Sequence, residues 1–159
     1  MPKLDAEKSY ILGIESTADD FSVGIASLDG KILANIISAF MSEEGGIHPR
    51  EAARHHAEVA GEVIKEAFEK AKIRPKQVAA VAFSQGPGLG PCLRTGATAV
   101  RALASYLQIP LVGVNHQLAH IEIGKLTTGA KDPVTLYVSG GSTIVAAFEE
   151  GRYRIFGET

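Results

Sequence analysis

Two histidines four residues apart are the first feature of this sequence with a clear chemical use. His116 and His120 fall in the segment 115–120, which reads Asn-His-Gln-Leu-Ala-His. Residues at positions i and i+4 share one face of a helix, so both imidazoles can point at a single ion. Neutral imidazole is a common metal ligand, but such a pair is also an ordinary polar feature of helices. A metal site is the first hypothesis.

A short glycine turn is the second such feature. Ser139, Gly140 and Gly141 follow an apolar run that reads as a strand. Backbone N–H groups exposed in a tight turn make a nest for anions, so the turn is a candidate phosphate contact. A plain β-turn is the structural alternative. The polar segment 15–17 stands in the same place after an earlier apolar run, which favours the phosphate interpretation.

The elements that must position these residues are predicted to be of mixed α/β type. Apolar runs bounded by glycine, proline and polar residues predict strands, and longer stretches with helical periodicity predict helices. In the first helix, the apolar stripe is expected at Ala53, Ala57, Ala60, Ile64, Ala67 and Ala71. The strands at 77–84 and 111–114 are nearly continuous apolar runs, which is typical of parallel strands covered on both faces. The predicted strands are 10–15, 21–28, 31–40, 77–84 and 111–114, and the predicted helices are 49–72, 91–107 and one that starts near the two histidines.

The segment 136–151 repeats the order of elements seen at the start of the chain. Both regions read as strand, polar turn, strand, acidic turn with glycine, and strand. A duplicated unit of this kind can grip a phosphate from two sides. We therefore expect an N-terminal extension at 1–9, a first lobe at 10–132 and the incomplete start of a second lobe at 133–159.

Composition narrows the class of protein. The chain has 159 residues, of which 45% are hydrophobic and 21% charged, and a formal net charge of -2. This charge gives no overall attraction to nucleic acid, so an RNA partner must be held by a local patch or by another subunit. The single cysteine, Cys92, cannot form an intramolecular disulfide, and no apolar run predicts a signal peptide or a membrane span. We expect a cytoplasmic protein.

Several multi-residue blocks occur along the chain, at 45–49, 54–58, 83–91, 114–120 and 137–141. The order of the repeat resembles the superfamily of actin, Hsp70 and sugar kinases. Within it, these blocks resemble the catalytic subunit that makes threonylcarbamoyladenosine in tRNA. The segment 90–94 and the tyrosine before Val138 resemble the archaeal and eukaryotic type, the KEOPS subunit, more than the bacterial type.

The resemblance implies a fold and an activity. The fold would be an actin-like ATPase (ribonuclease H-like) lobe, with a mixed sheet and helices on both faces, plus the first β-meander of a second, truncated lobe. The activity would be transfer of the threonylcarbamoyl group from threonylcarbamoyl-AMP to the exocyclic amine of the adenosine beside the anticodon in tRNAs that read ANN codons. The chain would supply half of this metal- and nucleotide-binding subunit, and alone it is expected to be inactive.

The resemblance also implies ligands and partners. His116, His120 and Tyr137 would bind one divalent metal ion, with iron as the first choice and zinc as the alternative. The segment Tyr137, Val138, Ser139, Gly140 and Gly141 would contact threonylcarbamoyl-AMP or another adenine nucleotide. The family's aspartate ligand lies outside these residues. The expected partners are tRNA, a kinase-like subunit and a small dimerising subunit, with a homodimer as a further option and no membrane.

Other residues carry weaker signals. The segment 85–90 resembles a phosphate cradle without the Lys-Ser/Thr of a P-loop, and we interpret it either as an active-site wall or as a structural turn. His55 and His56 lie on the long helix and are expected to be solvated or capping, with a role near the substrate or tRNA as the alternative. For Glu15, Asp19 and Asp20 in the first loop, a role with magnesium or water and a purely structural role remain equally open. Cys92 is expected to be a small packed residue rather than a reactive thiol.

Two rival functions remain for the structure to address. A metal-dependent glycopeptidase is disfavoured because the sequence has no His-Glu-x-x-His, and Gln117 cannot act as the general base of that motif. The other rival is an inactive truncated scaffold that binds partner subunits of the KEOPS complex. No Ser-His-Asp set is found, so we assign no catalytic residue and expect direct attack by the tRNA amine.

Overall fold

The structure is a computed structural model that describes residues 9–42 and 45–159. It divides into two compact units, Met1–His116 and Gln117–Thr159. The predicted boundary between 132 and 133 falls in the loop after helix α3, inside the second unit. The expected extension at 1–9 lies outside the described residues except for Ser9. No helix in the described part of the chain is long and apolar enough to cross a membrane.

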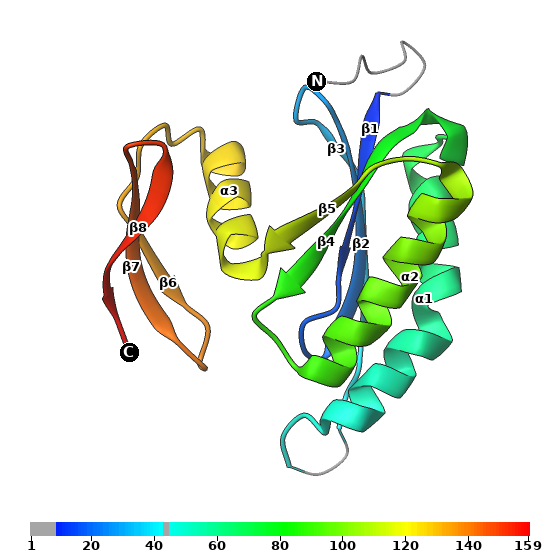
Figure 1. Cartoon of the computed structure of the whole chain (residues 1–159), viewed down its shortest axis with the longest axis horizontal. Coiled ribbons are helices and arrows are strands. Elements are labelled where there is room, and N and C mark those ends of the chain that lie inside the picture. Colours follow the sequence, from blue (N-terminus) through cyan, green and yellow to red (C-terminus); the bar gives the residue numbers. More distant parts are fainter. Residues whose placement is uncertain (1–8, 43–44) are drawn as a thin grey trace. The chain divides into compact units, whose positions relative to one another are not determined.

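A five-stranded mixed sheet forms the first unit (Figure 1). Strands β1 (Tyr10–Glu15), β2 (Asp20–Ser27) and β3 (Ile32–Ala39) pair antiparallel as a meander. Strands β4 (Val78–Gly86) and β5 (Leu111–Asn115) then run parallel to β1, giving the order β3-β2-β1-β4-β5. The carboxyl ends of the parallel strands β1, β4 and β5 therefore lie at the same end of the sheet.

Two long helices cover one face of this sheet. Helix α1 (Pro49–Ala71) begins with proline, and helix α2 (Gly90–Leu107) follows β4; a short 3-10 turn, η1 (Pro75–Gln77), precedes β4. Alternate strand side chains point toward the helices, as the period of two in a strand requires. The resulting core contains Leu12, Ile14, Phe21, Val23, Ile25, Val63, Ala67, Val81, Val100 and Ala104.

The buried stripe of α1 differs from the predicted one. Ala67 and Ala71 are buried as expected, but the other buried residues are Ala52, His56 and Val63. The predicted Ala53, Ala57 and Ile64 each lie one position after a residue that is buried, because alanines occur on several sides of this helix and leave its apolar face ambiguous. The prediction that His56 is solvated is wrong, since its side chain is fully buried.

One strand of the sheet is less buried than the sequence predicts. Helices α1 and α2 pack against each other and against the strands of the first unit. Strand β5 was predicted to be buried, but it is the edge strand, and its Leu111 and Val112 are 36% and 47% exposed. An edge strand lacks a neighbour on one side, so its apolar residues keep contact with solvent.

The second unit is a smaller assembly of helix and sheet. Helix α3 (His116–Thr128) starts at the last residue of the first unit and continues into the second. Strands β6 (Thr135–Val138), β7 (Thr143–Glu149) and β8 (Arg152–Glu158) form an antiparallel meander in the order β6-β7-β8. Its small core contains Ile121, Ile144 and Ala146, packed with Leu118, Tyr137 and Tyr153. The predicted repeat of the opening meander is confirmed.

Candidate functional site

The loop between β1 and β2 starts with a carboxylate that is held in place. Glu15 is the last residue of β1, and its Oε1 accepts hydrogen bonds from the backbone N–H and the hydroxyl of Thr17, each at 2.5 Å. Ser16 and Thr17 are only 2% and 5% exposed. The predicted polar loop is therefore a folded and largely buried turn.

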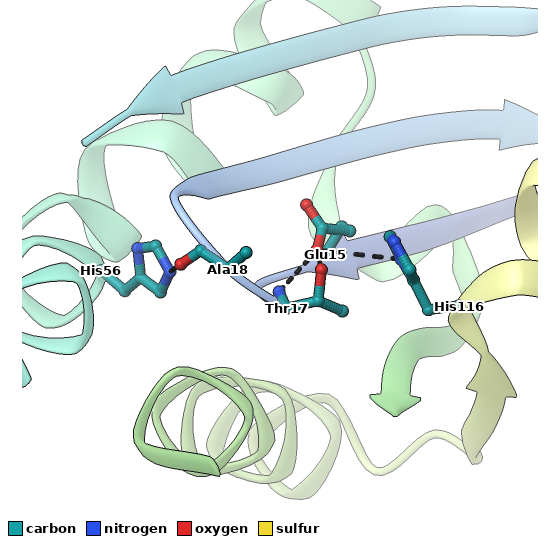
Figure 2. A network of polar contacts seen from close by, with 5 residues as sticks. All are labelled: Glu15, Thr17, Ala18, His56 and His116. Carbon is teal, nitrogen blue, oxygen red and sulfur yellow. Dashed lines mark hydrogen bonds and ion pairs between the residues drawn. The ribbon is translucent and has the colours of Figure 1, made fainter. Parts of the chain in front are cut away.

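Helix α1 contacts this loop through a buried histidine. His56 Nε2 lies 3.1 Å from the carbonyl oxygen of Ala18 (Figure 2). The ring of His56 also packs 5.7 Å from that of Phe21. Burial lowers the pKa of His56 below its ordinary value, so the neutral ring is favoured. The neutral ring then donates its Nε2–H to the carbonyl. The neighbouring His55 instead contacts Ser38 at 3.1 Å.

The connection from β4 to α2 closes on the same loop. The backbone N–H of Leu89 donates to the carbonyl oxygen of Thr17 at 2.7 Å. A Cβ placed on Gly88 would lie 2.6 Å from that oxygen, so only glycine allows the two backbones to approach this closely. Gly96 of α2 likewise leaves room for Ser16, whose Oγ would be 1.9 Å from an added Cβ. The segment 85–90 thus has a structural role here, and at least one of its N–H groups is used within the fold.

Cys92 is a packed residue, as predicted. Its side chain is fully buried, and its Sγ lies 3.6 Å from the carbonyl oxygen of Pro49. Burial raises the pKa of the Cys92 thiol, which keeps it protonated near neutral pH. This environment disfavours a thiolate nucleophile.

Acidic residues gather at the end of the loop. Burial raises the pKa of Asp20, and the negative charges of Asp19 and Glu15 raise it further. The carboxylates of Glu15, Asp19 and Asp20 together make a negative region at this end of the sheet. Such a region attracts cations, which keeps both interpretations of the first loop open.

His116 lies beside this acidic region, although β4 separates the strand that precedes His116 from β1. It is the first residue of α3, directly after β5, and its Nδ1 lies 4.0 Å from Oε1 of Glu15 (Figure 2). The side chains of His116 and Glu15 are 18% and 30% exposed. Sequence reasoning weighed Glu15 as an isolated loop residue and did not pair it with His116.

The second unit holds the remaining predicted site residues. The rings of His120 and Tyr137 lie 5.7 Å apart. Both line a pocket of about 390 Å³, which also contacts the β6 segment as far as Ser139. The structure thus brings His120 and the 137–139 segment to one cavity.

The Ser139–Ser142 turn is held by its own hydrogen bonds. Ser139 donates its backbone N–H to the Ser142 carbonyl at 3.1 Å, and Gln117 Nε2 donates to Ser142 Oγ at 3.3 Å. Gly140 has a φ of +82°, a backbone conformation that side chains disfavour. Ser139, Gly140 and Gly141 are exposed. Gln117 was not expected to support the turn.

The residues predicted to bind a metal can be compared with the donors that a metal needs. Helix α3 carries His116 and His120 one turn apart, and imidazole nitrogen is a donor type that suits a transition metal. Among the described residues, no group of three or more histidine, cysteine, aspartate or glutamate side chains is placed to hold an ion. The two histidines fit a metal by donor type, and the metal site stays a prediction.

Two solved structures with a similar fold have little sequence in common with this chain. YeaZ from Pseudomonas aeruginosa matches with a TM-score of 0.64 at 19% identity, over 95% of this chain and 66% of that one. Lmo2764 from Listeria monocytogenes, a proposed N-acetylmannosamine kinase, matches with a TM-score of 0.54 at 14% identity, over 91% of this chain and 49% of that one. These likenesses confirm the predicted α/β fold of the actin-like ATPase class and show nothing beyond it.

Curated relatives are much closer in sequence. A tRNA N6-adenosine threonylcarbamoyltransferase from Ignicoccus hospitalis is 57% identical over 150 residues, which is 94% of this chain and 46% of that protein. A probable bifunctional tRNA threonylcarbamoyladenosine biosynthesis protein from Methanothermobacter thermautotrophicus is 57% identical over 148 residues, which is 93% of this chain and 28% of that protein. The chain thus spans less than half the length of these relatives.

A family model decides the assignment and confirms the predicted resemblance. The model described as "TsaD: tRNA N6-adenosine threonylcarbamoyltransferase" matches residues 31–159, which is most of the chain. The match includes both histidines of α3 and the Ser139–Ser142 turn. This chain belongs to the TsaD family of tRNA N6-adenosine threonylcarbamoyltransferases.

Proposed function

We propose that this chain supplies half of the site that transfers a threonylcarbamoyl group from threonylcarbamoyl-AMP to the exocyclic amine of the adenosine beside the anticodon of ANN-decoding tRNAs. The support is membership of the TsaD family, with relatives that carry this transferase name aligned over more than nine-tenths of the chain. The observation that carries the site is helix α3, which presents His116 and His120 one turn apart directly after β5.

The metal in this proposal is one divalent ion, iron or zinc, held by His116, His120 and Tyr137. When bound, such a cation would polarise the carbamoyl carbonyl and stabilise negative charge that develops on its oxygen. The chain's own contribution is to present neutral nitrogen donors on a rigid helix. The 5.7 Å separation of the His120 and Tyr137 rings supports a shared role for these two side chains.

The adenylate would be received by the Ser139–Ser142 turn. Gly140 and Gly141 are exposed and carry no side chain that would keep a phosphate from their backbone N–H groups. The pocket beside Tyr137 and Val138 offers space for part of the substrate next to this turn. The residues of this segment would bind and orient the donor while tRNA approaches.

Transfer would proceed by direct attack of the tRNA amine on the carbamoyl carbon, with AMP as the leaving group. The buried Cys92, with its raised pKa, offers no nucleophile for a covalent intermediate. We assign no general acid or base to this chain. In the assembled enzyme, tRNA and the kinase-like and small dimerising subunits of a KEOPS complex would be its partners.

A scaffold function is the second candidate, and one observation favours it. Apolar side chains on β6 and β8 are largely exposed: Leu136, Val138, Ile155 and Phe156 range from 56% to 67%. Exposed apolar side chains favour contact with another protein surface. A chain that binds partners through them without catalysing transfer would match the scaffold interpretation.

The test is complementation in trans. The chain is mixed with threonylcarbamoyl-AMP and an ANN-decoding tRNA, alone and with the separately produced C-terminal part of the Ignicoccus hospitalis relative. Threonylcarbamoyladenosine is then measured by mass spectrometry of the digested tRNA. We expect product only in the mixture, and none with a His116→Ala/His120→Ala variant. Binding of the two parts without product, or equal product from the variant, would contradict the proposed site.

A further inference from the structure

Four side chains of the second unit connect helix α3 with strands β7 and β8 (Figure 1). Lys125 Nζ donates hydrogen bonds to Glu122 Oε1 and to the hydroxyl oxygen of Tyr153, each at 3.1 Å. The same ammonium group lies 5.5 Å from the ring centroids of both Phe148 and Tyr153. The hydroxyl of Tyr153 in turn donates to Glu122 Oε1. We call these four residues the Lys125 cluster.

The contacts of the Lys125 cluster support one another. The side chain of Lys125 is only 21% exposed, and the rings of Phe148 and Tyr153 pack edge to face at 5.2 Å. An ammonium group above aromatic faces is attracted by their electron density. The hydrogen bond with Tyr153 raises the pKa of Lys125 and lowers the pKa of Glu122, so both groups stay charged near neutral pH. The cluster therefore holds the lysine in one place.

Helix α3 has few apolar contacts that could fix its rotation about its own axis. Among its residues, all of which the structure describes, only Ile121 is buried, whereas α1 buries five residues. Lys125 follows Ile121 by four positions and lies on the same face of the helix. At the other end of α3, Gln117 Nε2 donates to Ser142 Oγ at 3.3 Å. The Lys125 cluster thus holds the second half of α3 against the meander.

The rotation of α3 decides where His120 lies relative to Tyr137. His120 directly precedes Ile121, and its ring lies 5.7 Å from that of Tyr137. Tyr137 of β6 packs, like Tyr153, against the apolar cluster that contains Ile121. With a helix radius of about 5 to 6 Å including side chains, a rotation of about 20° would displace the tip of His120 by about 2 Å. The separation of the two rings therefore depends on the contacts that prevent such a rotation.

We propose that Lys125 is a positioning residue for His120: through Tyr153 and Phe148 it fixes α3 on the meander and holds the imidazole beside Tyr137. The inference rests on the proposed function, in which His120 and Tyr137 bind one metal. Donor groups of such a site must be held within about 0.5 Å of their productive geometry, which a freely rotating helix would not achieve.

The direct test measures the contact between His120 and Tyr137 in the metal-free chain. The protein is labelled with ¹³C in histidine and tyrosine and treated with chelator, and nuclear Overhauser cross-peaks between the two rings are recorded. The His120→Gln and Tyr137→Phe variants identify the signals. Wild type and Lys125→Arg, which keeps the cation, should show the cross-peaks. Lys125→Met keeps the length of the side chain without its charge and should lose them.

Two further variants separate positioning from a general effect on folding. Lys131→Met removes an exposed lysine of the same unit and should leave the cross-peaks unchanged. Tyr153→Phe keeps the ring and removes only the hydroxyl, and it takes the place of Lys125→Met if that variant loses the backbone amide spectrum of the second unit. Unchanged cross-peaks in a folded Lys125→Met chain, even one of lower stability, would overturn the inference.

Metal binding gives a second readout and separates this inference from the function on which it rests. Zn²⁺ alone is titrated into wild type, Lys125→Met and Lys131→Met. We expect roughly 10-fold weaker binding by Lys125→Met only, the lower end of the range for loss of a residue that supports a ligand. Lost cross-peaks with no Zn²⁺ binding by any chain would keep the positioning role and contradict a metal site in this half. Equal Zn²⁺ affinity of wild type and Lys125→Met would overturn the role toward the metal.

Discussion

The chain contains two loops of the same design that are held in different ways. The loop after β1 is buried, and it is bonded to α1 through Ala18 and to the segment after β4 through Thr17. The Ser139–Ser142 turn after β6 is largely exposed and is held by bonds within itself and one bond from Gln117. The same order of strand, turn and strand therefore occurs once with strong tertiary support and once with little.

This difference bears on how each loop can act. A loop fixed by tertiary contacts presents its groups in one geometry before any ligand arrives, which is the basis of preorganised sites. A turn fixed locally can adjust to what it binds. In the proposed function, the second loop receives the substrate, while the first loop lies fixed beside His116.

Truncating His56 is the largest expected disturbance of the first loop. His56→Ala removes a fully buried ring and leaves the Ala18 carbonyl oxygen without its donor. We expect a loss of about 3 kcal/mol in the free energy of unfolding, from the cavity and the unpaired carbonyl together. Urea unfolding followed by circular dichroism measures it. If His56→Ala unfolds at the wild-type urea concentration, the first loop does not depend on this contact.

The close approach at Gly88 is the second test. Gly88→Ala would place a Cβ within 3 Å of the Thr17 backbone, so one of the two segments must move, at about 2 kcal/mol. Labelling of Cys92 by a thiol reagent should be slow in the wild-type chain and faster in this variant, because Cys92 follows on α2.

A matched glycine provides the control for that test. Gly61 lies in the middle of α1 on its solvent-exposed side, with open space around it. Gly61→Ala should increase stability by roughly 0.5 to 1 kcal/mol, since alanine is the better helix former. If Gly88→Ala and Gly61→Ala change stability in the same direction, the close approach of Gly88 to Thr17 is not the reason for glycine at position 88.

The titration of His56 has a smaller effect than its removal, because the ring stays in place. Burial lowers its folded-state pKa below the value of 6.5 that applies when the ring is free. Below pH 6.5 the unfolded chain therefore binds more protons at this residue than the folded chain does. The contribution of His56 to stability is complete above about pH 6.5 and is lost as the pH falls toward the folded-state pKa. Unfolding curves between pH 5 and 8 should show this loss, and His56→Gln should reduce it while His55→Gln should not.

The smallest effect is expected in the second loop. Ser142→Ala removes the hydroxyl that accepts from Gln117 and contacts Ser139. Because the turn is exposed, water replaces these partners, and the free energy of unfolding should fall by about 0.5 kcal/mol. A loss as large as that of His56→Ala would show that the two loops are supported equally, against the comparison above.

The elements of the fold could be read from local signals. Pro49 marks the start of α1 and the proline at 75 follows its end, while the period of two in β1 and β2 predicts which residues face the core. These features depend on neighbours within a few residues, and a sequence displays them directly. Family motifs then identified the topology.

The long-range contacts were harder to anticipate. Burial of His56 depends on a stripe of α1 that alanines on several sides obscure. Exposure of β5 depends on the number of strands in the sheet, which its apolar sequence does not state. The pairing of Glu15 with His116 needs the order of the parallel strands, so no spacing between the two residues could reveal it.

The central position of β1 also affects the order in which the strands can pair during folding. Its antiparallel partner β2 follows at once, but Tyr10 pairs on the other side with Val78, after all of α1 has been made. Contacts between distant segments slow folding, whereas the β6-β7-β8 meander joins neighbours only. During synthesis, this central strand of the first unit waits for its second partner until β4 has been made, and its apolar side chains stay partly uncovered during this interval.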